Sequence, residues 1–198
     1  MKELPELLVI DNFINDKNLI KQMKNPNDNF WKLGYSFWQG WWKSPAINIR
    51  HKLIEYIWRD NCPDSVSDIN LTGFEHWVGI LDKNTTIGNE EGYALNHHFD
   101  KDEGLFSKTK EIKTPIIGTV YYPITNEPQC KGGYLKIYDT HQDDLTAPYE
   151  LIAPRPNRLV IFDAGKLHAV QEIKEGIRKS VIINLWDNEP STEMKERY

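Results

Sequence analysis

The sequence contains few cysteines and no long apolar run, and both absences restrict its class. Cys62 and Cys130 are its only cysteines and lie far apart without CxxC spacing, which indicates free thiols in a reducing compartment instead of a disulfide scaffold. No apolar run reaches membrane-spanning length, and the start "MKELPELLVIDNF" lacks the basic region and uninterrupted apolar core of a signal peptide. We therefore expect a cytoplasmic protein without a membrane partner.

Positive charge is also scarce. The formal net charge is −5 and the pI is about 5.7, which gives no general electrostatic reason to bind a phosphate backbone. Nucleic acid is therefore not an expected partner. The chain has no internal repeat or low-complexity tract, and 198 residues with 39% apolar content suit one domain with a sizeable core. The oligomeric state has no signal in the sequence.

Residues 1–70 carry mainly helical signals. After a short strand-like run, "LLVIDNF", Asn15 or Asp16 can cap a helix that runs through Met23. For the next helix the N-cap candidate is Ser44, with Pro45 in the first turn, an apolar face that includes Leu53, and an end near Cys62. We expect these helices to support the rest of the fold.

From about residue 71 to 187 the sequence changes to short alternating or β-branched runs separated by Gly, Pro, Asn and Asp. Eight strands after a helical segment indicate a mainly β, α+β fold: a double-stranded β-helix, or jelly roll, with the N-terminal helices on one sheet. The expected strands are 73–81, 93–100, 115–122, 133–139, 149–153, 158–163, 167–173 and 177–186.

Two His-x-Asp pairs could begin a metal site. In a strand, His98 and Asp100 would share a face, and the four expected strands before His168 would let the chain return beside them. The second pair, His141 and Asp143, leaves only two strands before His168, so we interpret "THQDD" as an exposed turn. His98, Asp100 and His168 therefore form the predicted ligand set, and two histidines with one carboxylate are the facial triad of non-haem Fe(II) oxygenases.

The ordered motifs from about residue 74 to 186 give a more specific indication. "HFD", "TVYYPI", "GGYLKIY", the histidine of "KLHAV" and "GIRKSV" occur in the order found in the prolyl 4-hydroxylase-like Fe(II)/2-oxoglutarate-dependent dioxygenases, and the chain resembles that family. The resemblance implies Fe(II), 2-oxoglutarate as cosubstrate and dioxygen, with ascorbate as an optional addition. It also implies hydroxylation of an unactivated C–H bond, with a prolyl residue of a peptide or protein as the leading substrate.

The same resemblance assigns residues to 2-oxoglutarate. Arg178 offers a planar fork for the far carboxylate, Ser180 shares its strand face, and Tyr122 matches the family tyrosine that reaches the same group. Tyr121 is one register position away and stays an alternative. A surface ion pair of Arg178 with a nearby glutamate, and a core role for Tyr122, are the structural alternatives.

Other conspicuous residues receive structural interpretations. His97 is expected beside the site, His51 at or near the surface, and His76 in the core with its hydrogen bonds satisfied. The stretch 30–43 holds four of the seven tryptophans, of which at least two should pack in the core and the others could grip a peptide.

Two segments flank the expected ligand strand, 82–92 and 101–114, and are long enough to be lids. Residues 101–103 are interpreted as a solvated turn.

The fold alone does not fix the substrate. A free amino acid or a small metabolite is the alternative to a peptide. A cupin-like metalloenzyme without 2-oxoglutarate chemistry, and a non-enzymatic jelly-roll module, are the rival classes. Arg178 and Ser180 argue against the cupin-like enzyme, and the complete set of five polar positions argues against the non-enzymatic module.

Overall fold

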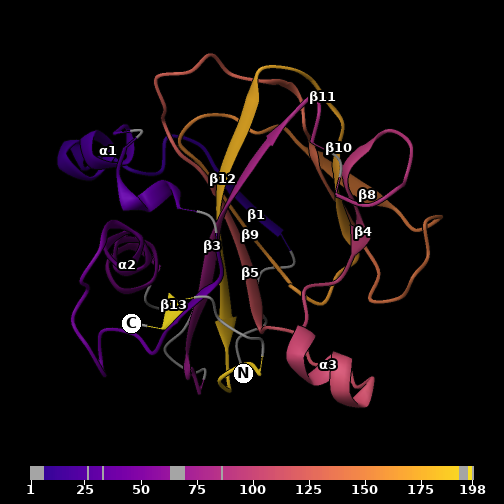
Figure 1. The fold of residues 1–198 in the computed structure, drawn as a ribbon, viewed down its shortest axis with the longest axis horizontal. Coiled ribbons are helices and arrows are strands. Elements are labelled where there is room, and N and C mark those ends of the chain that lie inside the picture. The colour runs from indigo at the N-terminus through magenta and orange to yellow at the C-terminus, as the bar shows by residue number, and fades with distance from the viewer. Residues whose placement is uncertain are drawn as a thin grey trace.

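The computed structural model describes residues 7–25, 27–32, 34–62, 70–85, 87–191 and 196–197. Two sheets, antiparallel apart from one parallel pairing at the edge of the larger sheet, face each other, and helices cover the outer face of the larger one (Figure 1). The mainly β jelly-roll prediction is therefore confirmed. Within these residues no helix has the length and apolarity required to cross a membrane.

The larger sheet has seven strands in the order β1-β9-β5-β12-β3-β2-β13. Its strands are β1 (Leu7–Ile10), β2 (Ser36–Trp38), β3 (Gly73–Asp82), β5 (Ile117–Tyr122), β9 (Arg158–Phe162), β12 (Ile177–Trp186) and β13 (Glu196–Arg197). The smaller sheet has the order β4-β10-β7-β8, with β4 (Tyr93–His98), β7 (Leu135–Tyr138), β8 (Tyr149–Ile152) and β10 (His168–Gln171). A two-stranded ribbon joins β6 (Lys131–Gly132) to β11 (Ile173–Glu175). All eight strands expected from the sequence are present.

Period-two alternation divides the larger sheet between two cores. On β5, Ile117 and Tyr121 face the helices, whereas Val120 and Tyr122 face the smaller sheet. The helix-side core includes α1 (Lys17–Met23), α2 (Ile49–Ile54) and the π-helical segment η2 (Glu55–Asn61), which Figure 1 shows on one side of β3. The functional cavity consequently opens on the other side, between the two sheets.

The second helix begins later than the sequence predicts. Asn48, not Ser44, is its N-cap, and the Asn48 side chain accepts a hydrogen bond from the His51 backbone N–H. Ser44 ends a turn in which its own N–H donates to the carbonyl of Gly40, and its hydroxyl accepts from the Trp38 indole. The prediction for α1 is confirmed, because the Asp16 side chain caps it.

Two histidines differ from their predicted surroundings. His51 is buried and stacks on Trp38 with ring centroids 4.4 Å apart, because α2 presents this side of the helix to the sheet. His76 lies in the helix-side core as expected, but neither ring nitrogen bonds to a residue that the structure describes. Burial holds the pKa of both histidines below the ordinary value, so both rings are neutral.

The tryptophan-rich stretch includes the short 3₁₀ helix η1 (Asn29–Trp31) and β2. Trp38 is buried, and Trp31 and Trp41 pack against the helix-side core while remaining partly exposed. Trp42 is exposed. Core packing is therefore confirmed for at least two of the four tryptophans.

Residues 101–114 are not a simple loop. They contain helix α3 (Glu103–Thr109), which lies at one end of the two sheets (Figure 1). Asp102 is buried and caps α3 by accepting from the Leu105 N–H, and its other oxygen accepts from the Ser191 N–H at 2.6 Å. The solvated-turn prediction for residues 101–103 is wrong at Asp102, because these two bonds hold its carboxylate inside.

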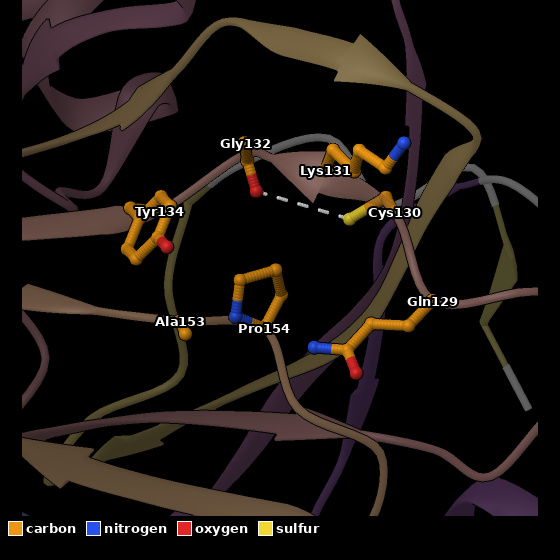
Figure 2. A pocket seen from close by; sticks show the side chains of 7 residues that line it. All are labelled: Gln129, Cys130, Lys131, Gly132, Tyr134, Ala153 and Pro154. Carbon is orange, nitrogen blue, oxygen red and sulfur yellow. Dashed lines mark hydrogen bonds between the residues drawn. The ribbon is translucent and has the colours of Figure 1, made fainter.

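A surface cavity of about 370 Å³ lies beside β6 (Figure 2). Its lining comprises Gln129, Cys130, Lys131, Gly132, Tyr134, Ala153 and Pro154. The Lys131 ammonium pairs with Glu175 at 2.5 Å, and burial raises the pKa of the Cys130 thiol. This cavity therefore offers neither a free charge nor a reactive thiolate.

Candidate active site

A larger cavity, of about 500 Å³, lies between the two sheets. Its walls come from β3, β5, β9 and β12 of the larger sheet and from β4, β7 and β10 of the smaller one, together with Tyr35 and the residues after β4. All three predicted ligand residues line it, as do Arg178 and Ser180. The three ligand residues and two of the three residues assigned to 2-oxoglutarate therefore line one chamber, and the third, Tyr122, bonds to Arg178 in its wall.

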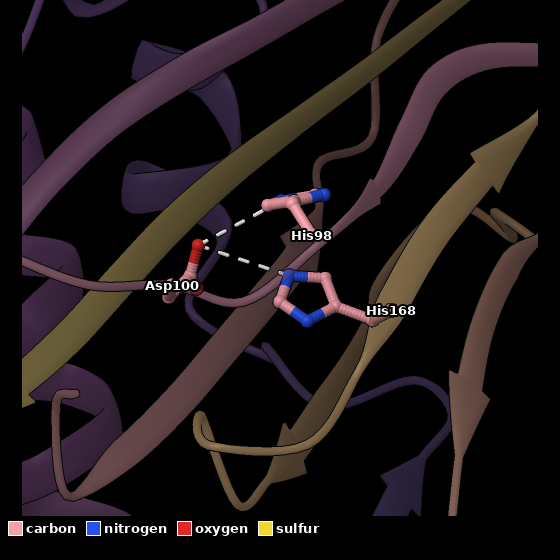
Figure 3. A group of neighbouring side chains, drawn as sticks. All are labelled: His98, Asp100 and His168. Atoms are coloured by element: carbon pink, nitrogen blue, oxygen red, sulfur yellow. Dashed lines mark ion pairs between the residues drawn. The ribbon is translucent and has the colours of Figure 1, made fainter. Parts of the chain in front are cut away.

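His98, Asp100 and His168 come together at one wall of this cavity (Figure 3). His98 ends β4 and His168 begins β10, and the two are paired across adjacent antiparallel strands. Asp100 follows β4 and turns back toward both rings. The Asp100 Oδ1 atom lies 3.8 Å from His98 Nε2 and 3.7 Å from His168 Nε2, separations too long for hydrogen bonds.

Backbone carbonyls fix the orientation of both imidazoles. His98 Nδ1 lies 2.8 Å from the carbonyl oxygen of Asn96, and His168 Nδ1 lies 2.9 Å from that of Lys166. Each Nδ1 must therefore carry the proton, which leaves the Nε2 lone pairs directed at the space beside Asp100. Burial, and then the neighbouring His168, lowers the pKa of His98 to about 4, so that ring is neutral. Two imidazoles and a carboxylate suit a divalent metal ion of the iron type.

Arg178 lies buried in the wall formed by β12. Its three nitrogens donate to the Gly133 carbonyl at 2.9 Å, the Ser180 hydroxyl at 3.0 Å and the Tyr122 hydroxyl at 2.9 Å. No carboxylate among the described residues pairs with it, so the surface ion pair considered from the sequence does not form. A buried guanidinium with neutral partners is suited to an incoming carboxylate.

The Gly-Gly turn before β7 permits this arrangement. Gly132 and Gly133 both have positive φ values, of 78° and 66°. A Cβ at Gly132 would lie 2.4 Å from the Glu172 carbonyl oxygen, and one at Gly133 would lie 3.0 Å from Arg178 Cδ. Glycine is therefore required here both for the backbone conformation and for the close approach of Arg178.

The register of β5 separates the two tyrosines that the sequence left open. Tyr122 faces the inter-sheet core and contacts Arg178, whereas Tyr121 faces the helices and donates to the Asn157 side chain at 2.9 Å. Only Tyr122 can therefore share a ligand with Arg178.

The remaining histidines lie outside the ligand group. His97 lies between Glu90, 2.5 Å from its Nδ1, and the Tyr138 hydroxyl, 2.9 Å from its Nε2. His141 is exposed and pairs with Asp163, so the exposed-turn prediction for 140–144 is confirmed.

The cavity lining also includes residues that the sequence analysis did not select, among them Tyr35, Glu75, Trp77 and Asn184. Asn184 Nδ2 donates to Asp100 Oδ2 at 3.1 Å, and Trp186 Nε1 donates to Glu75 Oε2 at 3.1 Å. The alternation that placed Arg178 and Ser180 on one face also places Asn184 there, and the same rule on β3 pairs Glu75 with Trp77. Tyr35 precedes β2 in irregular backbone, where no periodicity could have indicated it.

A jelly roll with two histidines and a carboxylate facing its interior is the arrangement of a non-haem iron oxygenase. The family described as the 2OG-Fe(II) oxygenase superfamily matches residues 84–186, just over half of the chain, and the chain belongs to this family. The resemblance stated from the sequence is thereby confirmed. The protein is an Fe(II)- and 2-oxoglutarate-dependent dioxygenase, and its family implies Fe(II), 2-oxoglutarate and dioxygen.

Solved structures of low sequence identity share the fold. A prolyl-4-hydroxylase from Pseudomonas putida is 13% identical with a TM-score of 0.54, over 93% of this chain and 89% of that one. A prolyl 4-hydroxylase from Phytophthora capsici is 14% identical with a TM-score of 0.58, over 94% of this chain and 60% of that one. A prolyl hydroxylase from Trichoplax adhaerens, in complex with a hypoxia inducible factor peptide fragment, is 15% identical with a TM-score of 0.50, over 92% and 84%. No curated protein matches the sequence.

Proposed function

We propose that this protein hydroxylates a prolyl residue in a peptide or protein. In this proposal His98, Asp100 and His168 hold Fe(II), and Arg178, Ser180 and Tyr122 hold the far carboxylate of 2-oxoglutarate. This proposal rests mainly on one observation: three converging ligand atoms, and a buried guanidinium that pairs with no carboxylate of the described residues, line one cavity of about 500 Å³.

Each side chain has a defined task. Bound Fe(II) would couple the oxidative decarboxylation of 2-oxoglutarate to oxygen insertion into a substrate C–H bond. The carbonyls of Asn96 and Lys166 keep the two Nε2 atoms unprotonated, and Asn184 holds one oxygen of Asp100 so that the other stays turned to the histidines. Arg178 binds and orients the cosubstrate, and the apolar walls limit the access of water.

A peptide substrate is supported by the prolyl hydroxylases that share the fold, one of which was solved with a peptide. The exposed rings of Tyr35 and Trp42 could grip an extended chain. The segments 82–92 and 101–114 adjoin β4 on either side, and we propose that they cover the bound substrate.

Anaerobic addition of Fe(II) and 2-oxoglutarate tests the cosubstrate assignment. The complex should develop the weak visible charge-transfer band of a chelated keto acid. His98→Ala should abolish the band, and the matched change His141→Ala, on an exposed turn, should leave it intact. Iron binding without the band in the wild type would contradict the proposal, and loss of the band in His141→Ala would mean that the wrong His-x-Asp pair was chosen.

A peptide library tests the substrate class. Incubation of proteome-derived peptides with enzyme, Fe(II), ascorbate, which we propose as an accessory reductant, and 2-oxoglutarate should add about 16 Da, one oxygen atom, to proline-containing peptides. Oxygen gain confined to free amino acids or small metabolites would exclude the peptide assignment while leaving the oxygenase class in place.

A further inference from the structure

One end of the active-site cavity carries hydrogen-bond acceptor atoms that contact neither the metal ligands nor the 2-oxoglutarate residues. Glu75 and Asn184 are directly opposite each other on β3 and β12, and both line the cavity. Arg178 is six residues from Asn184, roughly 20 Å along the strand at about 3.3 Å per residue. Asn184 contacts Asp100, so Glu75 and Asn184 lie on the side of the metal ligands away from Arg178. This is the end of the cavity left for the substrate.

Both groups at this end present hydrogen-bond acceptors. Glu75 is 4% exposed and receives a bond from the Trp186 indole, but it forms no ion pair with any residue that the structure describes. Asn184 is 1% exposed, its side-chain amide contacts both Asp100 and Glu75, and its Oδ1 has no hydrogen-bond partner in the described part of the chain. A buried acceptor without a donor is costly, and a ligand that brings N–H donors would remove the cost.

The surroundings favour positive charge in that ligand. The rings of Tyr35 and Trp77 lie 4.6 Å apart at the same part of the cavity, and aromatic faces attract cations. Burial, and then the charges of Asp100, Glu75 and Glu103, raises the pKa of Tyr35 to about 12, which indicates a negative potential here. The nearby Lys101 ammonium is already engaged, by Glu103 at 2.9 Å and by the Phe106 ring.

We propose that this subsite, formed by Glu75, Asn184, Tyr35 and Trp77, binds a protonated amine of the substrate. Glu75 releases its proton to solvent as the amine binds and then serves as the counter-ion, Asn184 Oδ1 accepts an N–H bond, and the two rings form the wall. The inference rests on the proposed function and narrows its substrate class. In a peptide the amine belongs to a lysine beside the hydroxylated residue, whereas a free amino acid presents its own ammonium.

Matched ligand pairs test the charge requirement by anaerobic calorimetric titration of the Fe(II)–2-oxoglutarate complex. The first pair is acetyl-Gly-Lys-Pro-Gly-amide and its norleucine counterpart, which has the same chain without the amine. The second is free proline and N-acetylproline, which separates an α-ammonium from a side-chain amine. The charged member of at least one pair should bind roughly 10- to 100-fold more tightly, as expected of hydrogen bonds to charged groups.

Substitution at Glu75 locates the effect. Glu75→Gln keeps the shape and removes the charge, so the preference within the pair should fall to about one, while Glu150→Gln, on the exposed face of β8, should retain it. A preference that survives Glu75→Gln would overturn the proposal, because the amine would then bind elsewhere.

Equal binding within both pairs, including no binding of any member, would also overturn it. That result is expected if Glu75 keeps its proton in the presence of the amine and donates it to Asn184 Oδ1, which would satisfy both groups without a ligand. The charge-transfer band separates this failure from failure of the proposed function. If the complex forms the band but binds charged and uncharged ligands equally, only the amine subsite is contradicted. If the complex does not form the band, the proposed function itself is contradicted.

Discussion

At the scale of single residues, adjacent side chains have different tasks because strand alternation sends them to opposite faces. Tyr121 and Tyr122 differ by one position, and one bonds to Asn157 in the helix-side core while the other bonds to Arg178 in the cavity. The same separation holds for Glu75, which lines the cavity, and His76, which faces the helices. Function in this fold is therefore sensitive to register.

The two tyrosines give a matched test of that assignment. Tyr122→Phe should weaken 2-oxoglutarate binding by about 0.5–1.5 kcal/mol, the usual contribution of one hydrogen bond, with little change in iron affinity. Tyr121→Phe should leave 2-oxoglutarate binding intact and lower the free energy of unfolding by a similar amount, because Asn157 Oδ1 loses one of its two donors, the other being the Ile14 N–H. Titration and urea unfolding of both variants measure this. The reverse pattern would show that Tyr121 contacts the cosubstrate.

Glu75 should make stability depend on pH. Burial, and then the charge of Asp100, raises its pKa from 4.5 to about 8. Between these values the folded state holds a proton that the unfolded state has released, so the free energy of unfolding must fall as pH rises from 4.5 to 8. Each pH unit in this window corresponds to roughly 1.4 kcal/mol, which gives a total on the order of a few kcal/mol.

Comparison with a neutral variant isolates this group. Glu75→Gln lacks the titration, so the metal-free wild type should lose stability relative to Glu75→Gln between pH 5 and pH 8 in urea unfolding. Glu150→Gln, exposed on β8, should follow the wild type throughout. A constant difference between wild type and Glu75→Gln across this range would mean that the carboxyl titrates normally.

The ligand set could be predicted from the sequence because His98, Asp100 and His168 belong to an ordered series of motifs. Glu75 and Asn184 could have been found by extending the alternation of β3 and β12, yet nothing in their spacing marks a substrate contact. Tyr35 could not have been found, since its position depends on irregular backbone before β2. The motifs shared with the family indicate the residues that we propose for the cosubstrate. The residues at the substrate end depend on which substrate this protein takes, so the fold does not indicate them.

At the scale of elements, strands were easier to predict than helix boundaries. The strands are marked locally by short β-branched or aromatic runs bounded by Gly, Pro, Asn and Asp, both where the strand is fully buried, as in β5, and where it is mostly exposed, as in β8. The start of α2 depends on competition between Ser44 and Asn48, and the turn at Gly40 together with the Trp38 indole occupies Ser44. The pairing of β1 with β9 joins Leu7 to Phe162 and is likewise set by tertiary structure.

The cap of α2 can be tested directly. Asn48→Ala should lower the free energy of unfolding by about 1 kcal/mol, because the His51 N–H loses its acceptor at the helix start. Asn48→Asp retains a side-chain acceptor and should cost much less. Urea unfolding gives the free energies and far-ultraviolet circular dichroism gives the helix content. A larger loss of helix in Ser44→Ala than in Asn48→Ala would indicate that the helix begins at Ser44, as predicted from the sequence.

At the scale of the whole molecule, the active site joins the two sheets. His98 and His168 belong to the smaller sheet, whereas Arg178, Ser180 and Tyr122 belong to the larger one. The helices are packed on the far face of the larger sheet, so the inter-sheet side is free to form the cavity. A ligand held at both ends would therefore bind the folded state selectively and connect the two layers.

Ligand binding should consequently raise the unfolding temperature in two separable steps. A ligand at 100 times its dissociation constant adds about 2.7 kcal/mol to the free energy of unfolding, or roughly 5–10 °C for a chain of this size. Fe(II) should give one increment and 2-oxoglutarate a second, and chelation of the metal should remove both, because the cosubstrate also binds through the ion. Arg178→Ala should keep the metal increment and lose most of the second, since it removes the buried cation that we propose as the partner of the far carboxylate. Arg155→Ala should keep both increments. It is a matched change, because Arg155 is exposed and its Nη1 lies 3.8 Å from Asp11 Oδ2. Anaerobic scanning calorimetry measures these shifts, and a full 2-oxoglutarate increment in Arg178→Ala would show that the far carboxylate is held by another part of the cavity.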